Sequence, residues 1–360
     1  MAGWRQRARL GRLAGLGLLA GLLGVSVAAA CPLCLGAFRP TASQQLVALP
    51  HAVLARRSGD GVYSVLDLIK GEAPAGGNIL ANAIQLDLVM PPDAVLLLFR
   101  DESWSEWVAA GAVAVEDAGW LREIARGKRP QDMTDEDWKA RVALVLPHLQ
   151  PGEPLATKIA YGELATAPYA ALLAEKPRLD PAAIRRWLAD PELSVRRPVY
   201  LLLLGVAGDE KDAQNIEQRL DAEWLTGDAT DLGPALAADL QLRGPSRLAW
   251  VDARYMDDRA RSTKELEAAL LALSVLGKAD GEIPRERIVE SYLKFIRAHR
   301  DLAGLVAWDL AAWNVWDAAP LYREIMKSNI RQHFASQVAI AEYLARSPKE
   351  GAEAASVTSK

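Results

Sequence analysis

A change in the spacing of apolar residues near Val115 divides this chain into two kinds of structure. Along residues 62–68, apolar side chains occur on both sides of a period-two alternation, which is typical of a strand buried on both faces. After Val115 the spacing becomes helical, as in the row that begins with Leu266, Ala269 and Leu270. The pattern therefore predicts an α+β protein, with a small N-terminal β-barrel followed by an all-α part.

The first part, residues 31–116, is expected to be a small β-rich domain. A short helix is predicted at 41–49, and turn-forming Gly, Pro, Asn and Asp residues separate five candidate strands at 51–57, 61–69, 77–87, 94–100 and 111–115. About five strands in fewer than about 90 residues fit an OB-like barrel.

The second part, residues 117–346, is expected to consist of short helices in pairs. Good helix starts are Thr134 before Asp137, Asp180 before Pro181, and Ser262 with Glu265; the expected stops are Gly205, Gly208, Gly244 and Gly277. Short helices cannot each bury an apolar face alone, so stacking into an α-solenoid is expected, with a compact irregular helical domain as the alternative. Residues 347–360 are expected to be a disordered tail.

The first 30 residues have the three parts of a signal peptide. A basic start is followed by an apolar stretch at 13–27 and by three small residues at 28–30; the basic residues are Arg5, Arg7, Arg9 and Arg12. We expect cleavage after residue 30, because the apolar stretch is shorter than a membrane-spanning helix. The protein is thus predicted to be exported, to the periplasm or the cell envelope of a bacterium.

The charge balance of the exported part excludes one class of partner. Removing the four signal arginines from 42 basic residues leaves 38 against 46 acidic ones, a net charge of about −8. Nucleic-acid binding needs a basic face, so it is not expected. A protein or peptide partner is compatible with this charge, and contact with a membrane is expected only through a lipid anchor.

Cys31 and Cys34 are the two cysteines of the chain, and four interpretations of them stay open. Cys31 is a candidate for lipidation if cleavage exposes it. The pair is also a candidate for a thiol–disulfide redox site. Metal binding would need two further ligands with suitable spacing, which the sequence does not offer. The fourth interpretation is a local disulfide that stiffens the start of the first domain.

The rest of the chain carries no recognisable catalytic motif. The four histidines at positions 51, 148, 299 and 333 have no partner at i+3 or i+4, and phosphate-loop, nucleophile-elbow and zinc-protease patterns are missing. We therefore expect no catalytic residues, no metal and no cofactor.

Trp308 and Trp316 are the candidate binding residues of the helical part. They are eight residues apart, which places them on one face of a continuous helix. Packing between helices is one interpretation, and an aromatic groove for a peptide or glycan is the other.

Three resemblances add to these patterns. The segment 184–205, with its Asp190-Pro191 turn and Val195-Arg196 at the start of the next helix, resembles a HEAT repeat. The order Cys-x-x-Cys, short helix and strand at 51–55 resembles exported netrin-like and metalloproteinase-inhibitor-like modules. Several segments resemble an uncharacterised family of exported bacterial proteins with a Cys-Pro-x-Cys start: 31–34, 161–165, 186–191, 203–209 and 309–313.

These observations predict a non-enzymatic binding or scaffold protein of the cell envelope, built from an OB-like barrel and a HEAT-like solenoid. One alternative is an envelope thiol–disulfide redox protein that uses Cys31 and Cys34. Another, implied by the resemblance to inhibitors, is a module that acts through the mature N-terminus. This chain has Cys-x-x-Cys where those inhibitors have Cys-x-Cys.

Overall fold

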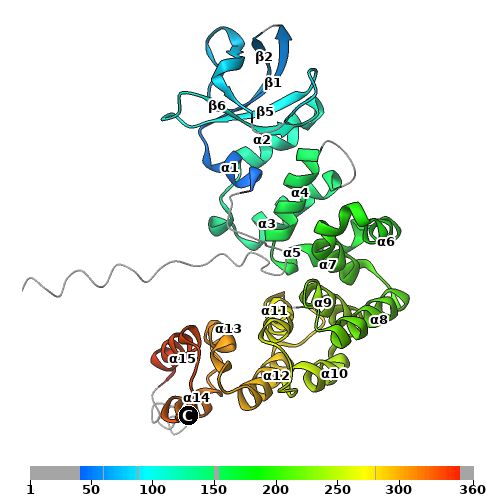
Figure 1. Cartoon of the computed structure of the whole chain (residues 1–360), viewed down its shortest axis with the longest axis vertical. Helices are drawn as coiled ribbons and strands as arrows, with labels where there is room; N and C mark the ends of the chain where they lie inside the picture. The colour runs from blue at the N-terminus through cyan, green and yellow to red at the C-terminus, as the bar shows by residue number, and fades with distance from the viewer. Residues whose placement is uncertain (1–40, 60, 87–88, 150–153, 280, 349–360) are drawn as a thin grey trace, which may run out of the picture.

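A computed structural model describes residues 41–59, 61–86, 89–149, 154–279 and 281–348 of the chain. The signal peptide, Cys31, Cys34 and nearly all of the expected tail lie outside the described residues. The described part is an α+β structure with a barrel-like sheet at one end and a curved array of helices (Figure 1).

The sheet forms a nearly closed barrel. Its strands lie in the order β3-β2-β1-β5-β6-β4, and β4 pairs with β6 in parallel while the other pairs are antiparallel. The strands are β1 (His51–Gly59), β2 (Val62–Lys70), β3 (Asn78–Leu80), β4 (Ile84–Gln85), β5 (Val95–Arg100) and β6 (Trp107–Ala112). This arrangement fits the OB-like barrel expected from the sequence.

Two strand predictions need correction. The strand expected at 77–87 is interrupted by a 3-10 turn at Ala81–Ala83, because this segment passes from the edge of β2 to the edge of β6 and so closes the barrel. The strand expected at 111–115 instead runs over Trp107–Ala112. Its small residues hide the alternation, whereas Trp107 is buried inside the barrel.

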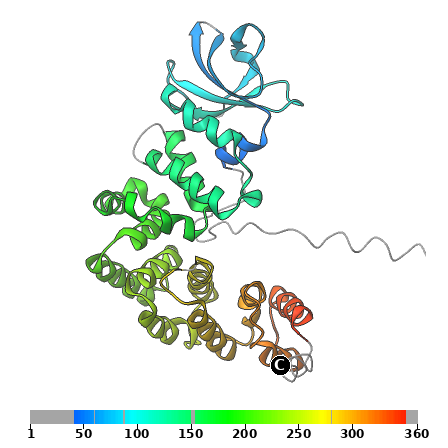
Figure 2. The ribbon, with the colours of Figure 1, turned by 180° about the vertical axis from the view of Figure 1, so that it is seen from behind.

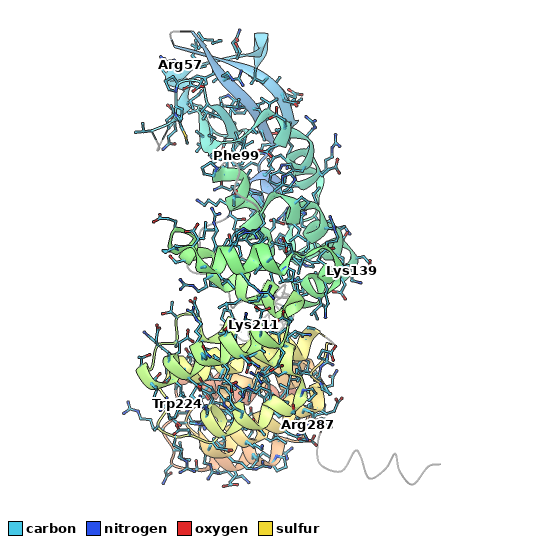
Figure 3. The ribbon with its side chains drawn as sticks, turned by 90° about the vertical axis from the view of Figure 1, so that its right-hand side faces the viewer. Arg57, Phe99, Lys139, Lys211, Trp224 and Arg287 are labelled. Carbon is cyan, nitrogen blue, oxygen red and sulfur yellow. The ribbon has the colours of Figure 1, made fainter. Side chains whose placement is uncertain are left out.

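Both faces of the central strands are buried, but against different partners. In β5, Leu96 and Leu98 point into the barrel interior, while Leu97 and Phe99 join the core shared with the helices. Phe99 is labelled in Figure 3 on the side of the barrel that meets the helices. The strand from which this expectation came differs: in β2, Leu66 and Leu68 are 43% and 39% exposed, so residues 62–68 do not form a strand buried on both faces.

The hydrophobic core continues without a break from the barrel into the helices, of which α1 precedes the barrel and the others follow it. The α-helices are α1 (Ala42–Ala48), α2 (Ala118–Arg126), α3 (Asp135–Val145), α4 (Pro154–Thr166), α5 (Tyr169–Ala174), α6 (Pro181–Ala189), α7 (Arg197–Ala207), α8 (Glu210–Thr226), α9 (Leu232–Arg243), α10 (Leu248–Val251), α11 (Thr263–Ala279), α12 (Arg285–Ala298), α13 (Ala307–Ala312), α14 (Ala319–Lys327) and α15 (Phe334–Arg346). None of the described helices has the length and apolar character needed to cross a membrane.

In the middle of the array, alternate helices stack in a row. Helix α7 packs closely on α9, and α9 packs on α11; α6, α8 and α12 pair with α7, α9 and α11 respectively. Seen from behind in Figure 2, the ribbon curves from the barrel through this row to α13, α14 and α15 at the far end.

The predicted helix starts are confirmed, whereas two predicted stops are wrong. Thr134, Asp180 and Ser262 each accept a hydrogen bond from a backbone N–H of the helix that follows. Gly205 and Gly277, however, lie inside α7 and α11. Each glycine permits a close approach: a Cβ at Gly205 would lie 2.7 Å from the Cα of Ala238, and one at Gly277 would lie 2.6 Å from the Trp313 ring.

Candidate functional site

A closed ring of four charged side chains links α8, α9 and the turn before α10. Both oxygens of Asp239 are used: Oδ1 accepts from Nε of Arg243 at 3.0 Å, and Oδ2 accepts from Nε of Arg247 at 2.6 Å. Glu217 closes the ring through contacts of 2.8 Å to Arg243 and 2.9 Å to Arg247. Two positive and two negative groups thus balance within one cluster.

Burial governs the electrostatics of this ring. Asp239 is fully buried, and burial raises the pKa of its carboxyl even though Arg247 and Arg243 act in the opposite direction. An ionised carboxylate at this position depends on its two guanidinium partners, because removing either partner would leave a buried charge without compensation. The ring therefore fixes the two arginine side chains in place.

A series of arginine–tryptophan contacts continues from this ring. The guanidinium carbon of Arg247 lies 3.7 Å from the centre of the Trp250 ring, and that of Arg254 lies 4.1 Å from the same ring. Arg254 and Arg261 also lie over Trp224 of α8, at 5.2 and 4.9 Å. Trp224, labelled in Figure 3, lies near the C-terminal end of α8. Cation–π contacts of this kind hold α8 against the segment 247–261.

An open depression of about 420 Å³ lies beside the ring. Its walls combine both charges, a hydroxyl, an aliphatic side chain and an indole; they are Glu210, Leu242, Arg243, Ser246, Arg247 and Trp250. Glu210 is 66% exposed, and its Oε1 lies 3.6 Å from Nη1 of Arg243, which is too long for a hydrogen bond. The contact between Glu210 and Arg243 can therefore be replaced when either side chain pairs with an opposite charge on a ligand.

The chain continues from α10 into a π-helical turn, Asp252–Met256. Such turns are rare and are frequent at functional sites. Several buried polar atoms around it have no hydrogen-bond partner within the described residues: Arg247 Nη2, Asp252 Oδ1, Tyr255 Oη, Glu223 Oε2, Trp224 Nε1 and His299 Nε2. Buried polar atoms are normally satisfied, so this concentration marks the region as unusual.

Burial also shifts the titration of the groups around this turn. It raises the pKa of Tyr255 to about 12 and raises the pKa of Glu223 above its ordinary value. It lowers the pKa of His299, although the backbone of Met256 and the charge of Asp301 act in the opposite direction. All three shifts favour the neutral form of the side chain.

This region offers groups suited to binding charged and apolar parts of a ligand. Its arginines are held by carboxylates and indoles, while the depression offers an exposed carboxylate and a guanidinium with donors to spare. Within the described residues, His, Cys, Asp and Glu side chains form no group of three or more that could hold a metal ion.

The two tryptophans singled out in the sequence occupy different environments. Helix α13 ends at Ala312, so the continuous helix that would align Trp308 with Trp316 is not present. Trp308 is 47% exposed on α13, whereas Trp316 is half-buried with its ring centre 5.1 Å from that of Tyr343. Trp308 is thus the more accessible of the two for a binding role.

The sequence contained one signal for the arginine–tryptophan series. Arg247, Trp250 and Arg254 have the i, i+3, i+7 spacing of one helix face. The same spacing occurs on many solvated helices, so it did not single out these residues. In the ring around Asp239, the residues Asp239, Arg243 and Arg247 are also spaced by four along the chain, whereas Glu217 lies on another helix and no local pattern brings it to them.

No family model matches the chain, and comparisons with curated proteins and with solved structures also give no match. The resemblances named from the sequence therefore stay predictions.

Proposed function

We propose that this chain is a non-enzymatic binding or scaffold protein of the bacterial cell envelope, exported by residues 1–30, with a protein or peptide partner. The observation that carries the proposal is the depression at Glu210, Arg243 and Trp250. Its carboxylate, guanidinium and indole match the mixed charges and apolar groups of a peptide, and tryptophan and arginine are common anchors in protein interfaces.

The stacked helices support this proposal. The row α7, α9 and α11, with α6, α8 and α12 as paired helices, is the arrangement that a HEAT-like solenoid would have, and such stacks offer extended surfaces for partners. Several charges between these helices are used in ion pairs: Arg185 with Asp212 at 2.7 Å, and Asp231 with Arg197 and Arg219 at 3.0 and 2.6 Å. Charged side chains that are held in ion pairs of this kind make the surface rigid and are not free to react.

Site-specific photocrosslinking in cells tests the proposal. A photoreactive residue is placed at Ser246, on the depression, and at Val195, which is 84% exposed in the turn before α7. We expect one reproducible protein adduct at position 246 and none at 195. The charge reversal Glu210→Arg should reduce that adduct several-fold, while Glu267→Arg on the exposed side of α11 should leave it unchanged. If neither variant changes the yield of the adduct at position 246, the partner does not bind at the depression and the proposal is contradicted.

A second candidate function, thiol–disulfide exchange, rests on the Cys31-x-x-Cys34 motif. Replacing both cysteines by Ser separates the two candidates. If the chain is a redox protein, the double variant will lose all thiol–disulfide activity, measured as reduction of insulin. If the chain is a scaffold, the double variant will keep the crosslinked adduct at position 246. The intact mass of the processed chain from membrane and soluble fractions would report cleavage, lipidation of Cys31 and any disulfide.

A further inference from the structure

Helix α15, drawn in red in Figure 1 at the end of the array opposite the barrel, is apolar on two opposite faces. One face packs into the protein through its buried residues Ser336, Ala339, Ile340 and Tyr343. The other face is exposed and carries what we call the α15 stripe: Phe334, Val338, Ala341 and Ala345.

The α15 stripe is one continuous strip along the helix. Its members are spaced by four, three and four residues, which places them on a single face at 3.6 residues per turn. Phe334 is 77% exposed and Val338 is 44% exposed. A helix with apolar residues on two opposite faces normally has neighbours on both sides, and within the described residues the α15 stripe has no neighbour that buries it.

The residues that follow α15 do not offer a matching face. Residues 349–360 contain a single large apolar residue, Val357, among Gly, Ala, Ser, Thr and charged residues. By contrast, the stripe itself has a self-complementary pattern: its two large side chains lie toward the N-terminal end of α15, and its two alanines lie toward the C-terminal end.

We propose that the α15 stripe is a homodimer contact, in which α15 packs antiparallel against α15 of a second copy about a two-fold axis. In this pairing Phe334 faces the partner's Ala345, and Val338 faces the partner's Ala341. Each large side chain then fits against a small one, and every contact occurs twice, as a two-fold interface requires.

The size of this surface sets the expected strength. One helix pair buries less than the roughly 800 Å² per partner of a standard interface, so the dimer should be weak and depend on concentration. Sedimentation velocity of the purified chain from about 1 to about 200 µM should show a monomer–dimer equilibrium with a Kd of about 10 to 100 µM. Phe334→Glu should weaken dimerisation by about tenfold or more, since a charge would be buried at the contact. Val195→Glu, the matched change at an exposed apolar residue elsewhere, should have no effect.

Crosslinking tests the antiparallel register. In a background with Cys31 and Cys34 replaced by Ser, a Phe334→Cys chain mixed with an Ala345→Cys chain should form a disulfide-linked heterodimer. Each variant alone should form the corresponding homodimer at least several-fold less. A chain that stays monomeric over the whole concentration range would overturn the proposal, as would dimerisation that Phe334→Glu leaves intact. Neither result bears on the adduct at position 246, so this proposal and the proposed function can fail independently.

Discussion

Arg247 Nε donates a hydrogen bond of 2.6 Å to Asp239 Oδ2, and the carboxylate that accepts it is wholly excluded from solvent. The same guanidinium lies 3.7 Å from the Trp250 ring. One arginine therefore joins the buried charge ring of α8 and α9 to the aromatic side of the depression. Changes at Asp239 should consequently affect both the stability of the helices and the shape of the candidate site.

The charge ring should be essential for stability. Asp239→Ala removes the carboxylate that balances Arg243 and Arg247, and breaking a buried ion pair in this way costs about 3–5 kcal/mol. Urea unfolding at neutral pH should show this loss in the free energy of unfolding. The control Glu267→Ala, at an exposed position of α11, should change it by less than about 0.5 kcal/mol. Similar losses for both variants would mean that the ring does not stabilise the fold.

The contact of Gly277 with Trp313 predicts an unfavourable Gly→Ala substitution inside a helix. Alanine normally stabilises a helix interior by about 1 kcal/mol relative to glycine. At Gly277, however, the new methyl group would lie 2.6 Å from the indole, and such overpacking costs about 1–3 kcal/mol. Gly119→Ala in α2 is the control, because its Cβ meets no atom within 4 Å. Thermal unfolding should show a lower Tm for Gly277→Ala and an unchanged or higher Tm for Gly119→Ala.

The arginine–tryptophan series should show energetic coupling. A double-mutant cycle with Trp250→Leu and Arg254→Met measures how far the two side chains stabilise each other. Cation–π pairs contribute about 0.5–1 kcal/mol when partly exposed, and the guanidinium of Arg254 lies 4.1 Å from the Trp250 ring. We expect a coupling energy in that range from chemical denaturation. If the effects of the two single variants are additive, the coupling energy is zero and the contact does not stabilise the fold.

The buried His299 and the partly buried His148 should make the protein less stable in mild acid. Burial lowers the pKa of both His148 and His299 from the ordinary value of 6.5. The unfolded chain therefore binds more protons than the folded chain below about pH 6.5, so the free energy of unfolding should fall as the pH decreases.

The measurement is the slope of unfolding free energy against pH between about pH 7.5 and 5.5. The double variant His148→Gln/His299→Gln should have a clearly shallower slope than the parent chain, whatever its absolute stability. An equal slope in both proteins would assign the pH dependence to other groups.

Local sequence signals predicted much of the fold. The capping residues Thr134, Asp180 and Ser262 act within three residues of their partners, so their hydrogen bonds follow from the chain itself. Gly205 and Gly277 misled the prediction because a glycine that ends a helix and one that admits a neighbouring side chain look alike in sequence. Only the packing of Ala238 and Trp313 distinguishes these two cases.

The candidate site was less accessible to sequence reasoning. Glu210 and Glu217 lie on α8, Asp239 and Arg243 on α9, and Trp250 on α10; no short motif joins them. Trp308 and Trp316 show the opposite problem, because their spacing implied a shared face that the end of α13 at Ala312 removes.

The sequence by itself determined the switch from strands to helices and most of the helix starts, because these depend on side-chain spacing and on hydrogen bonds between near neighbours. Only the tertiary structure decided how the segment after β2 closes the barrel, how Glu217 of α8 joins the charges around Asp239, and which face of α15 is left exposed. Those features depend on contacts between residues distant along the chain, where burial fixes both the geometry and the cost of leaving a group unpaired.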